Sequence, residues 1–170
     1  LRNYSRPITD FERIKRIHVH KLLQELTEMS GWLLGKAGVE LRCEPIPESL
    51  ALDGHTNQLL QVLITLINNA RDAVSGLPEP WISLAVRVIK GGQTVEIRVM
   101  DSSDGVPEEL HNAINKAFAG SSSAAALGVS TSKRILNTHG GDLTVDRECP
   151  HACFVIRLPL AKTGTSAQAA

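Results

Sequence analysis

The stretch Gln58–Val74, QLLQVLITLINNARDAV, decides the interpretation of the whole chain. Its apolar residues recur at spacings of three and four, a pattern that predicts a helix with one buried face. The residues of this face are Leu59, Val62, Leu63, Leu66, Ile67, Ala70, Ala73 and Val74. We therefore expect this segment to be the central helix of the core.

A second stripe on the same helix carries short polar side chains: Gln58, Gln61, Thr65, Asn69 and Asp72. An ordinary solvated face would carry Lys, Glu and Arg, whereas Asn, Thr and Asp are poorer helix formers. Side-chain oxygens aimed from a helix into a cleft would suit a hard cation such as Mg²⁺. The alternative is a polar stripe that is hydrogen-bonded to a neighbouring loop, and the helix alone does not decide between the two.

The composition restricts the class of protein. A chain of 170 residues with 42% hydrophobic content predicts one globular domain with a substantial core. Lys plus Arg and Asp plus Glu number 18 each, and aromatic residues make up 4%, so neither the charge nor the stacking surface of a nucleic-acid binder is present. The odd number of cysteines and the lack of a long apolar run favour a reduced, cytoplasmic setting. Because the chain opens without Met, we expect a longer protein, in which any membrane anchor lies upstream.

The order of expected elements predicts an α/β fold. Helices are expected over 19–36, from an N-cap at Asp53 or Thr56 to about 75, over 107–118 and over 127–138. Strands are expected over 39–43, 50–52, 81–89, 94–100, 143–145 and 154–158. This order indicates a two-layer sandwich, in which about three helices cover one face of a mixed, mostly antiparallel sheet of about five strands. We expect a linker over 1–10, the domain over 11–160, a mobile segment over 119–126 and a disordered tail over 161–170.

Three stretches carry chemically informative residues. The first is the Asn-bearing helix; the second is VMDSSDGVP at 99–107, in which a carboxylate leaves the end of a strand just before a Gly turn; the third is LGVS at 127–130, which opens a helix ending in HGG at 139–141. In order and spacing, these stretches resemble the ATP-binding catalytic domain of sensor histidine kinases. That domain belongs to the superfamily of gyrase, heat-shock chaperone and mismatch-repair ATPases. The resemblance covers about 5–160, and SRP at 5–7 looks like the end of the dimerisation helix that precedes such a domain.

The resemblance implies a Bergerat-type fold that binds ATP and Mg²⁺. By this resemblance, Asn69 would offer its side-chain oxygen to Mg²⁺, and Asp72 would assist. Asp101 would accept a hydrogen bond from the adenine amino group, and Gly105 would let the backbone approach the base. The phosphates would be bound at a helix N-terminus by oriented N–H groups. The residues implied there are Leu127, Gly128, Val129 and Ser130.

The resemblance also implies partners. The γ-phosphate would pass to a His on a separate dimerisation domain of the same protein, which is a homodimer through a region absent from this chain. A response-regulator receiver domain would be the downstream partner. No catalytic residue is expected within the chain itself, because phosphoryl transfer needs mainly positioning and charge neutralisation.

Several positions depart from the family pattern. Ser103 stands where the first glycine of Asp-x-Gly-x-Gly is expected, and Thr65 where a second Asn is common. In the lid, Gly-x-Gly-Leu-Gly is expected, but Ala124 and Ala126 replace the two leading glycines. The competing hypothesis is therefore a pseudo-kinase or regulatory docking module of the same fold, with weak or no nucleotide binding.

Two further groups of residues were weighed and disfavoured. His18 and His20 at the start of the first helix are more often solvated residues than phospho-acceptors or metal ligands. A metal site made by Cys149, His151 and Cys153 would place three ligands in one turn.

Overall fold

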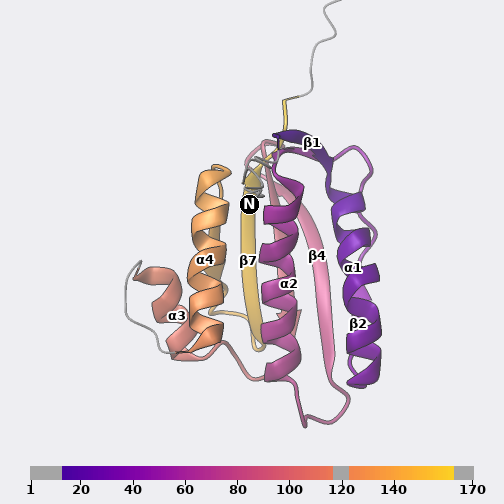
Figure 1. The fold of residues 1–170 in the computed structure, drawn as a ribbon, viewed down its shortest axis with the longest axis vertical. Coiled ribbons are helices and arrows are strands. Elements are labelled where there is room, and N and C mark those ends of the chain that lie inside the picture. Colours follow the sequence, from indigo (N-terminus) through magenta and orange to yellow (C-terminus); the bar gives the residue numbers. More distant parts are fainter. Residues whose placement is uncertain (1–12, 117–122, 163–170) are drawn as a thin grey trace, which may run out of the picture.

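The computed structural model describes residues 13–116 and 123–162. Its elements form two layers, with helices over one face of a five-stranded sheet (Figure 1). The helices are α1 (Val19–Lys36), α2 (Thr56–Ala73), α3 (Glu108–Asn115) and α4 (Ala124–Thr138). The strands are β1 (Lys15–His18), β2 (Glu40–Cys43), β3 (Ala51–Gly54), β4 (Trp81–Ile89), β5 (Thr94–Asp101), β6 (Asp142–Val145) and β7 (Ala152–Pro159).

The main sheet has the strand order β2-β4-β5-β7-β6. The edge strand β2 runs parallel to β4, and every other pair in this sheet is antiparallel. The expected α/β sandwich with a mixed, mostly antiparallel sheet is confirmed. Strand β5 lies at the centre of this order, so both of its edges are paired and the position of its last residue, Asp101, is set from both sides.

Helix α2 is central in the helical layer, with α1 on one side and α4 on the other (Figure 1). Its buried face includes Leu63 and Leu66, which belong to one hydrophobic core with Ile82 and Ile97 of the sheet. Burial of such side chains contributes about 1.5–3 kcal/mol each. The sequence prediction of this face is correct except at Ala73, which is exposed.

Glycine allows α4 to approach α2 closely. A Cβ added at Gly128 would lie 2.9 Å from the Cγ2 atom of Thr65 on α2. The Thr65 hydroxyl donates a hydrogen bond to the Gln61 carbonyl at 2.8 Å, within its own helix. Thr65, in the polar stripe of α2, is therefore half-buried and lies against α4.

Two predictions near the N-terminus are wrong. Strand β1 was not expected, because it has four residues and buries only Ile17, so it shows no clear hydrophobic alternation. It pairs antiparallel with β3, where Asp53 forms an ion pair with Arg16 at 2.9 Å. Asp53 is thus a strand residue, and His55 rather than Asp53 or Thr56 is the N-cap of α2.

The predicted boundaries around the Ala-rich segment also need correction. Helix α3 ends at Asn115, and α4 begins at Ala124, three residues earlier than expected. The Ser123 hydroxyl caps α4 by accepting a hydrogen bond from the Ala126 N–H at 3.1 Å. Because Ala is the best helix former, its run lengthens the helix by three residues at the start. The expected mobility of residues 123–126 stays a prediction. The remainder of that prediction, at 119–122, lies outside the described residues.

The first residue of the tail expected over 161–170 is hydrogen-bonded to the folded domain. The Ala161 N–H donates to the Ala51 carbonyl at 2.8 Å, so the chain follows β7 past β3. The predicted linker over 1–10 and the tail beyond Lys162 lie outside the described residues. Within the described ranges, no helix combines the length and apolar character required to cross a membrane.

Candidate functional site

Asp101 ends β5 as a buried carboxylate, with 4% of its surface exposed. One of its oxygens accepts a hydrogen bond from the Ser103 N–H at 2.8 Å. Burial raises the pKa of Asp101 above its usual value, and the hydrogen bond from the Ser103 N–H opposes this rise. Burying a carboxylate is costly unless it is well hydrogen-bonded, so this position is typical of a binding group rather than of a packing residue.

The loop after Asp101 is held from β4 and from the β6–β7 connection. The Ser102 hydroxyl accepts a hydrogen bond from the Trp81 N–H at 3.1 Å. His151 Nδ1 donates to the Ser103 carbonyl at 3.2 Å, and its ring contacts Trp81 edge-on with centroids 5.1 Å apart. The Ser103 hydroxyl is buried without a well-formed hydrogen bond to any described residue. From the sequence, Ser103 was expected only as the residue that replaces a family glycine. Its contacts with Asp101 and His151 were not expected, because no local sequence pattern encodes them.

Gly105 adopts φ +149°, a conformation that L-residues rarely reach. A Cβ added there would meet no atom of the described residues within 4 Å, so this part of the structure leaves space beside the backbone. The close approach of a ligand to Gly105 stays a prediction.

Asn69 is half-buried on α2, and its side-chain nitrogen is buried without a hydrogen-bond partner among the described residues. An unsatisfied buried amide costs free energy, so an external partner is expected. Asp72, one turn further on, differs: its side chain is 76% exposed and lies 3.6 Å from Arg71. Asp72 also lines a cavity of about 410 Å³ with Gly38, Ser75 and Pro80. The structure therefore does not give Asp72 the buried setting of Asn69.

The predicted phosphate-binding residues lie inside α4 rather than at its start. Because α4 begins at Ala124, the N–H groups of Gly128, Val129 and Ser130 come after its first four residues. Beyond those four, backbone N–H groups bond to carbonyls one turn earlier within the helix. The expectation that these amides open the helix is wrong.

The side chains around Gly128 differ in their surroundings. Leu127 is 63% exposed, whereas Val129 is fully buried in the core. The Ser130 hydroxyl donates to the Ala113 carbonyl at 3.1 Å and so joins α4 to α3. Phosphate binding by these residues stays a prediction.

The HGG triplet connects the end of α4 to the start of α2. His139 Nδ1 donates to the Ile135 carbonyl at 2.8 Å, and its Nε2 accepts from the His55 N–H at 3.1 Å. The end of α4 is thus tied to the start of α2. A Cβ at Gly54 would lie 2.6 Å from the His139 ring, and one at Gly141 would lie 2.2 Å from the Arg157 carbonyl oxygen. The triplet was predicted from the sequence as part of the family pattern, but its contacts with Gly54, His55 and Arg157 were not predicted.

Comparison with known proteins agrees with this architecture. Residues 54–162 match the family described as "Histidine kinase-, DNA gyrase B-, and HSP90-like ATPase". The two-component sensor PprA of Pseudomonas aeruginosa is 33% identical over 138 residues, which are 75% of this chain and 14% of that protein. The sensory histidine kinase/phosphatase NtrB of Rhodobacter capsulatus is 26% identical over 159 residues, 87% of this chain and 44% of that protein.

Solved structures show the same fold. The catalytic domain of the histidine kinase ThkA superposes with a TM-score of 0.73 at 21% identity, covering 86% of this chain and 95% of that domain. Full-length ShkA in complex with AMPPNP gives a TM-score of 0.69 at 24% identity, covering 87% of this chain and 31% of ShkA. This chain spans less than half the length of the curated relatives described above. The chain belongs to the family of histidine kinase-, DNA gyrase B- and HSP90-like ATPases.

Proposed function

We propose that this chain is the ATP-binding catalytic domain of a two-component sensor histidine kinase. It holds Mg·ATP between α2, the end of β5 and the start of α4, and donates the γ-phosphate to a His on a dimerisation domain of the same protein. Two observations carry the proposal: Asp101 on β5 is a buried carboxylate, and the buried side-chain amide of Asn69 on α2 has no hydrogen-bond partner among the described residues. Helix α2 packs against β5. Membership of an ATPase family and the fold of ThkA support it.

Asp101 selects the base. Its carboxylate accepts a hydrogen bond from the exocyclic amino group of adenine, while the Ser103 N–H holds the carboxylate in place. Guanine carries an oxygen at the corresponding position, and a buried carboxylate facing that oxygen would be left unpaired, so guanine is rejected. The open space at Gly105 admits the base next to the backbone.

Asn69 serves the phosphate end. Its amide oxygen is a suitable ligand for Mg²⁺. Its amide nitrogen, which has no hydrogen-bond partner in the described part of the chain, can donate to a phosphate oxygen. Bound Mg²⁺ neutralises charge on the phosphates. The contribution of the protein is then positioning, which is most of what phosphoryl transfer requires.

The proposed partners follow from the relatives. ThkA has been solved in complex with the response regulator TrrA, at a TM-score of 0.71 to this chain. We expect this chain to act with a response-regulator receiver domain and to be dimeric through a region beyond it. A cytoplasmic location accompanies this assignment, because ATP and receiver domains are found there.

The second candidate is a docking module that has kept the fold and lost the ligand. One observation favours it: the Ala-rich segment forms the first turn of α4, and Ser123 already satisfies two of its amides, those of Ala126 and Leu127. Fewer free N–H groups then remain for phosphates.

The full-length protein incubated with γ-labelled ATP tests the proposal. We expect acid-labile, base-stable label on a His outside this chain, abolished by Asn69→Ala and retained in Gln58→Ala, an exposed residue of the same helix. Label that persists in Asn69→Ala would contradict the role of Asn69. Absence of label with retained binding of a receiver domain would favour the docking module.

A further inference from the structure

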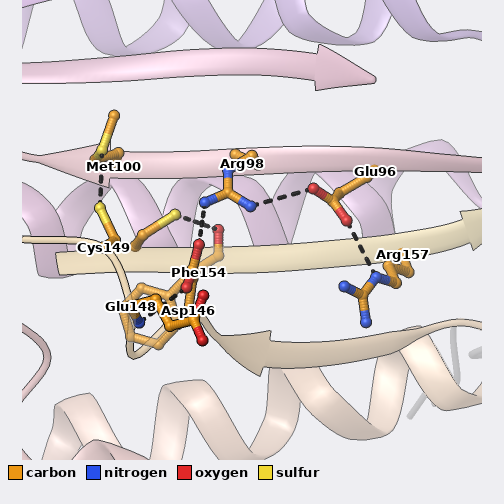
Figure 2. A network of polar contacts seen from close by, with 9 residues as sticks. Glu96, Arg98, Met100, Asp146, Glu148, Cys149, Phe154 and Arg157 are labelled. Atoms are coloured by element: carbon orange, nitrogen blue, oxygen red, sulfur yellow. Dashed lines mark hydrogen bonds and ion pairs between the residues drawn. The ribbon is translucent and has the colours of Figure 1, made fainter. Parts of the chain in front are cut away.

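The face of the sheet that the helices leave uncovered carries its own cluster of side chains (Figure 2). Side chains alternate across a strand, so Glu96, Arg98 and Met100 of β5 share the face opposite to that of Asp101. Arg98 bridges Glu96, at 3.2 Å, and Asp146, at the start of the β6–β7 connection. These ion pairs fix the connection against the sheet.

Three sulfur atoms gather next to this network. The Cys149 thiol donates to the Met100 sulfur at 3.3 Å (Figure 2). Met100 in turn lies directly opposite Cys153 in the β5–β7 register. Directly opposed residues have Cβ atoms only about 4.5–5.5 Å apart and side chains on the same face. The chain holds three cysteines and two methionines, so most of its sulfur is concentrated at this one place.

The surroundings suit a soft cation. Cys153 is fully buried, while Cys149 is half-exposed and provides access from solvent.

We infer that Met100, Cys149 and Cys153 form a binding site for a single soft monovalent cation of the Cu(I) type. Thiolate and thioether ligands select such ions over Mg²⁺, Ca²⁺ and Mn²⁺, which prefer oxygen. Binding forms two metal–thiolate bonds and one metal–thioether contact, and the two thiol protons pass to solvent.

A zinc site formed by Cys149, His151 and Cys153 fits the structure less well than the proposed Cu(I) site. Among the residues that the structure describes, no group of three His, Cys, Asp or Glu side chains could hold a metal ion. The trio of Cys149, His151 and Cys153 considered from the sequence is therefore not formed. His151 instead directs its Nδ1 to the Ser103 carbonyl. The thioether of Met100 takes the third position.

The test uses the 170-residue chain and Cu(I) supplied as its bicinchoninate complex under anaerobic, reducing conditions. We expect one Cu(I) per chain by native mass spectrometry. Cys149→Ser should weaken binding by more than about 100-fold, because loss of a ligand exceeds the 10–100-fold loss typical of second-shell changes. Met100→Leu should weaken it less. The chain provides matched controls in Cys43→Ser and Met29→Leu, both exposed, which should bind as the wild type does.

A second measurement separates binding from misfolding. Cu(I) should raise the melting temperature of the wild type and of Cys43→Ser, but not that of Cys149→Ser, whose metal-free melting curve shows whether it is folded. Lack of binding by the wild type, undiminished binding by Cys149→Ser, or loss of binding in Cys43→Ser would each overturn the inference. A Cys149–Cys153 disulfide formed with peroxide in a chain that takes up no Cu(I) would do so too, and would indicate a redox pair.

Discussion

The end of β5 and the start of α4 both border the proposed nucleotide site, but they differ in how closely their residues match the family pattern. At the end of β5, Asp101 is a buried carboxylate, and Gly105 leaves open space beside the backbone. At the start of α4, Ala124 and Ala126 stand in for expected glycines, and Ser123 caps the helix that they form. The end of β5 thus presents a buried carboxylate beside open space, whereas the first turn of α4 has its amides hydrogen-bonded by Ser123.

This difference indicates where affinity should come from. A buried polar group without a partner costs free energy that a ligand can recover, whereas an amide already bonded within a helix gains little from a phosphate. We therefore expect the base and the metal to dominate nucleotide binding in this chain, with a reduced contribution from the triphosphate.

The largest expected effect comes from restoring the glycines. The double variant Ala124→Gly/Ala126→Gly should lower the free energy of unfolding by about 2 kcal/mol, because each Gly costs about 1 kcal/mol relative to Ala in a helix. It should also strengthen ATP binding, because glycine at these two positions of the family pattern reaches backbone conformations that Ala adopts only at a cost. Denaturant unfolding and an ATP titration measure the two effects.

Ala125→Gly is the matched control for this variant. It lies between the two positions in the same turn and should cost about 1 kcal/mol of stability without the gain in affinity. An equal gain in affinity from Ala125→Gly, or none from the double variant, would show that the Ala substitutions do not limit binding.

A smaller effect is expected where α4 packs on α2. Gly128→Ala places a Cβ 2.9 Å from Thr65 Cγ2. The higher helix propensity of Ala stabilises the fold by about 1 kcal/mol, but the strain of this close contact should cost about 1–3 kcal/mol and outweigh it. In a Thr65→Ala background the contact disappears, and the same change should become neutral or stabilising. A double-mutant cycle of unfolding free energies measures the coupling; additive effects would refute the packing explanation.

The acid side of the stability profile should report on Asp101. Burial raises its pKa in the folded state, so the folded chain holds this proton more tightly than the unfolded chain does. The stability that Asp101 contributes is present below its unfolded pKa and is lost as the pH rises through the folded pKa. Asp101→Asn should therefore be more stable than the wild type at neutral pH, with an advantage that shrinks toward acid. Unfolding free energies across this range, with exposed Asp104→Asn as control, test the sign.

The smallest effect is expected at Asp72. This side chain is exposed and only 3.6 Å from Arg71, and surface pairs contribute about 0–1 kcal/mol. Asp72→Asn should leave both stability and ATP affinity nearly unchanged. If Asp72→Asn lost as much ATP affinity as Asn69→Ala does, Asp72 would have to be a binding residue of the nucleotide site.

Much of the fold could be predicted because the decisive patterns are local. The apolar periodicity of α2 and the alternation of β4 and β5 placed those elements closely. Strand β1 was missed because its pairing with β3 joins segments far apart in the chain and buries one side chain. The start of α4 was misplaced because the family pattern expects glycines there, whereas the local propensity of three alanines favours helix.

Part of the candidate site was predictable for the same reason. Asn69 and Asp101 stand in motifs that sequence reveals, and the structure gives both a buried setting. The contacts of Ser103 with His151, and of His139 with His55, cross from one element to another and leave no trace in spacing. Exposure of Asp72 follows from the orientation of α2 against its neighbours, which periodicity alone does not fix.

Calorimetric titration of this chain with ATP and with ADP, each with and without Mg²⁺, tests the central claim most directly when Asp101→Asn is measured beside the wild type. The account predicts micromolar binding that Mg²⁺ strengthens for ATP and that the variant loses. No binding by the folded wild type at millimolar nucleotide, or equal binding by Asp101→Asn, would contradict it. In the first case the chain would be a docking module; in the second, the base would be recognised elsewhere.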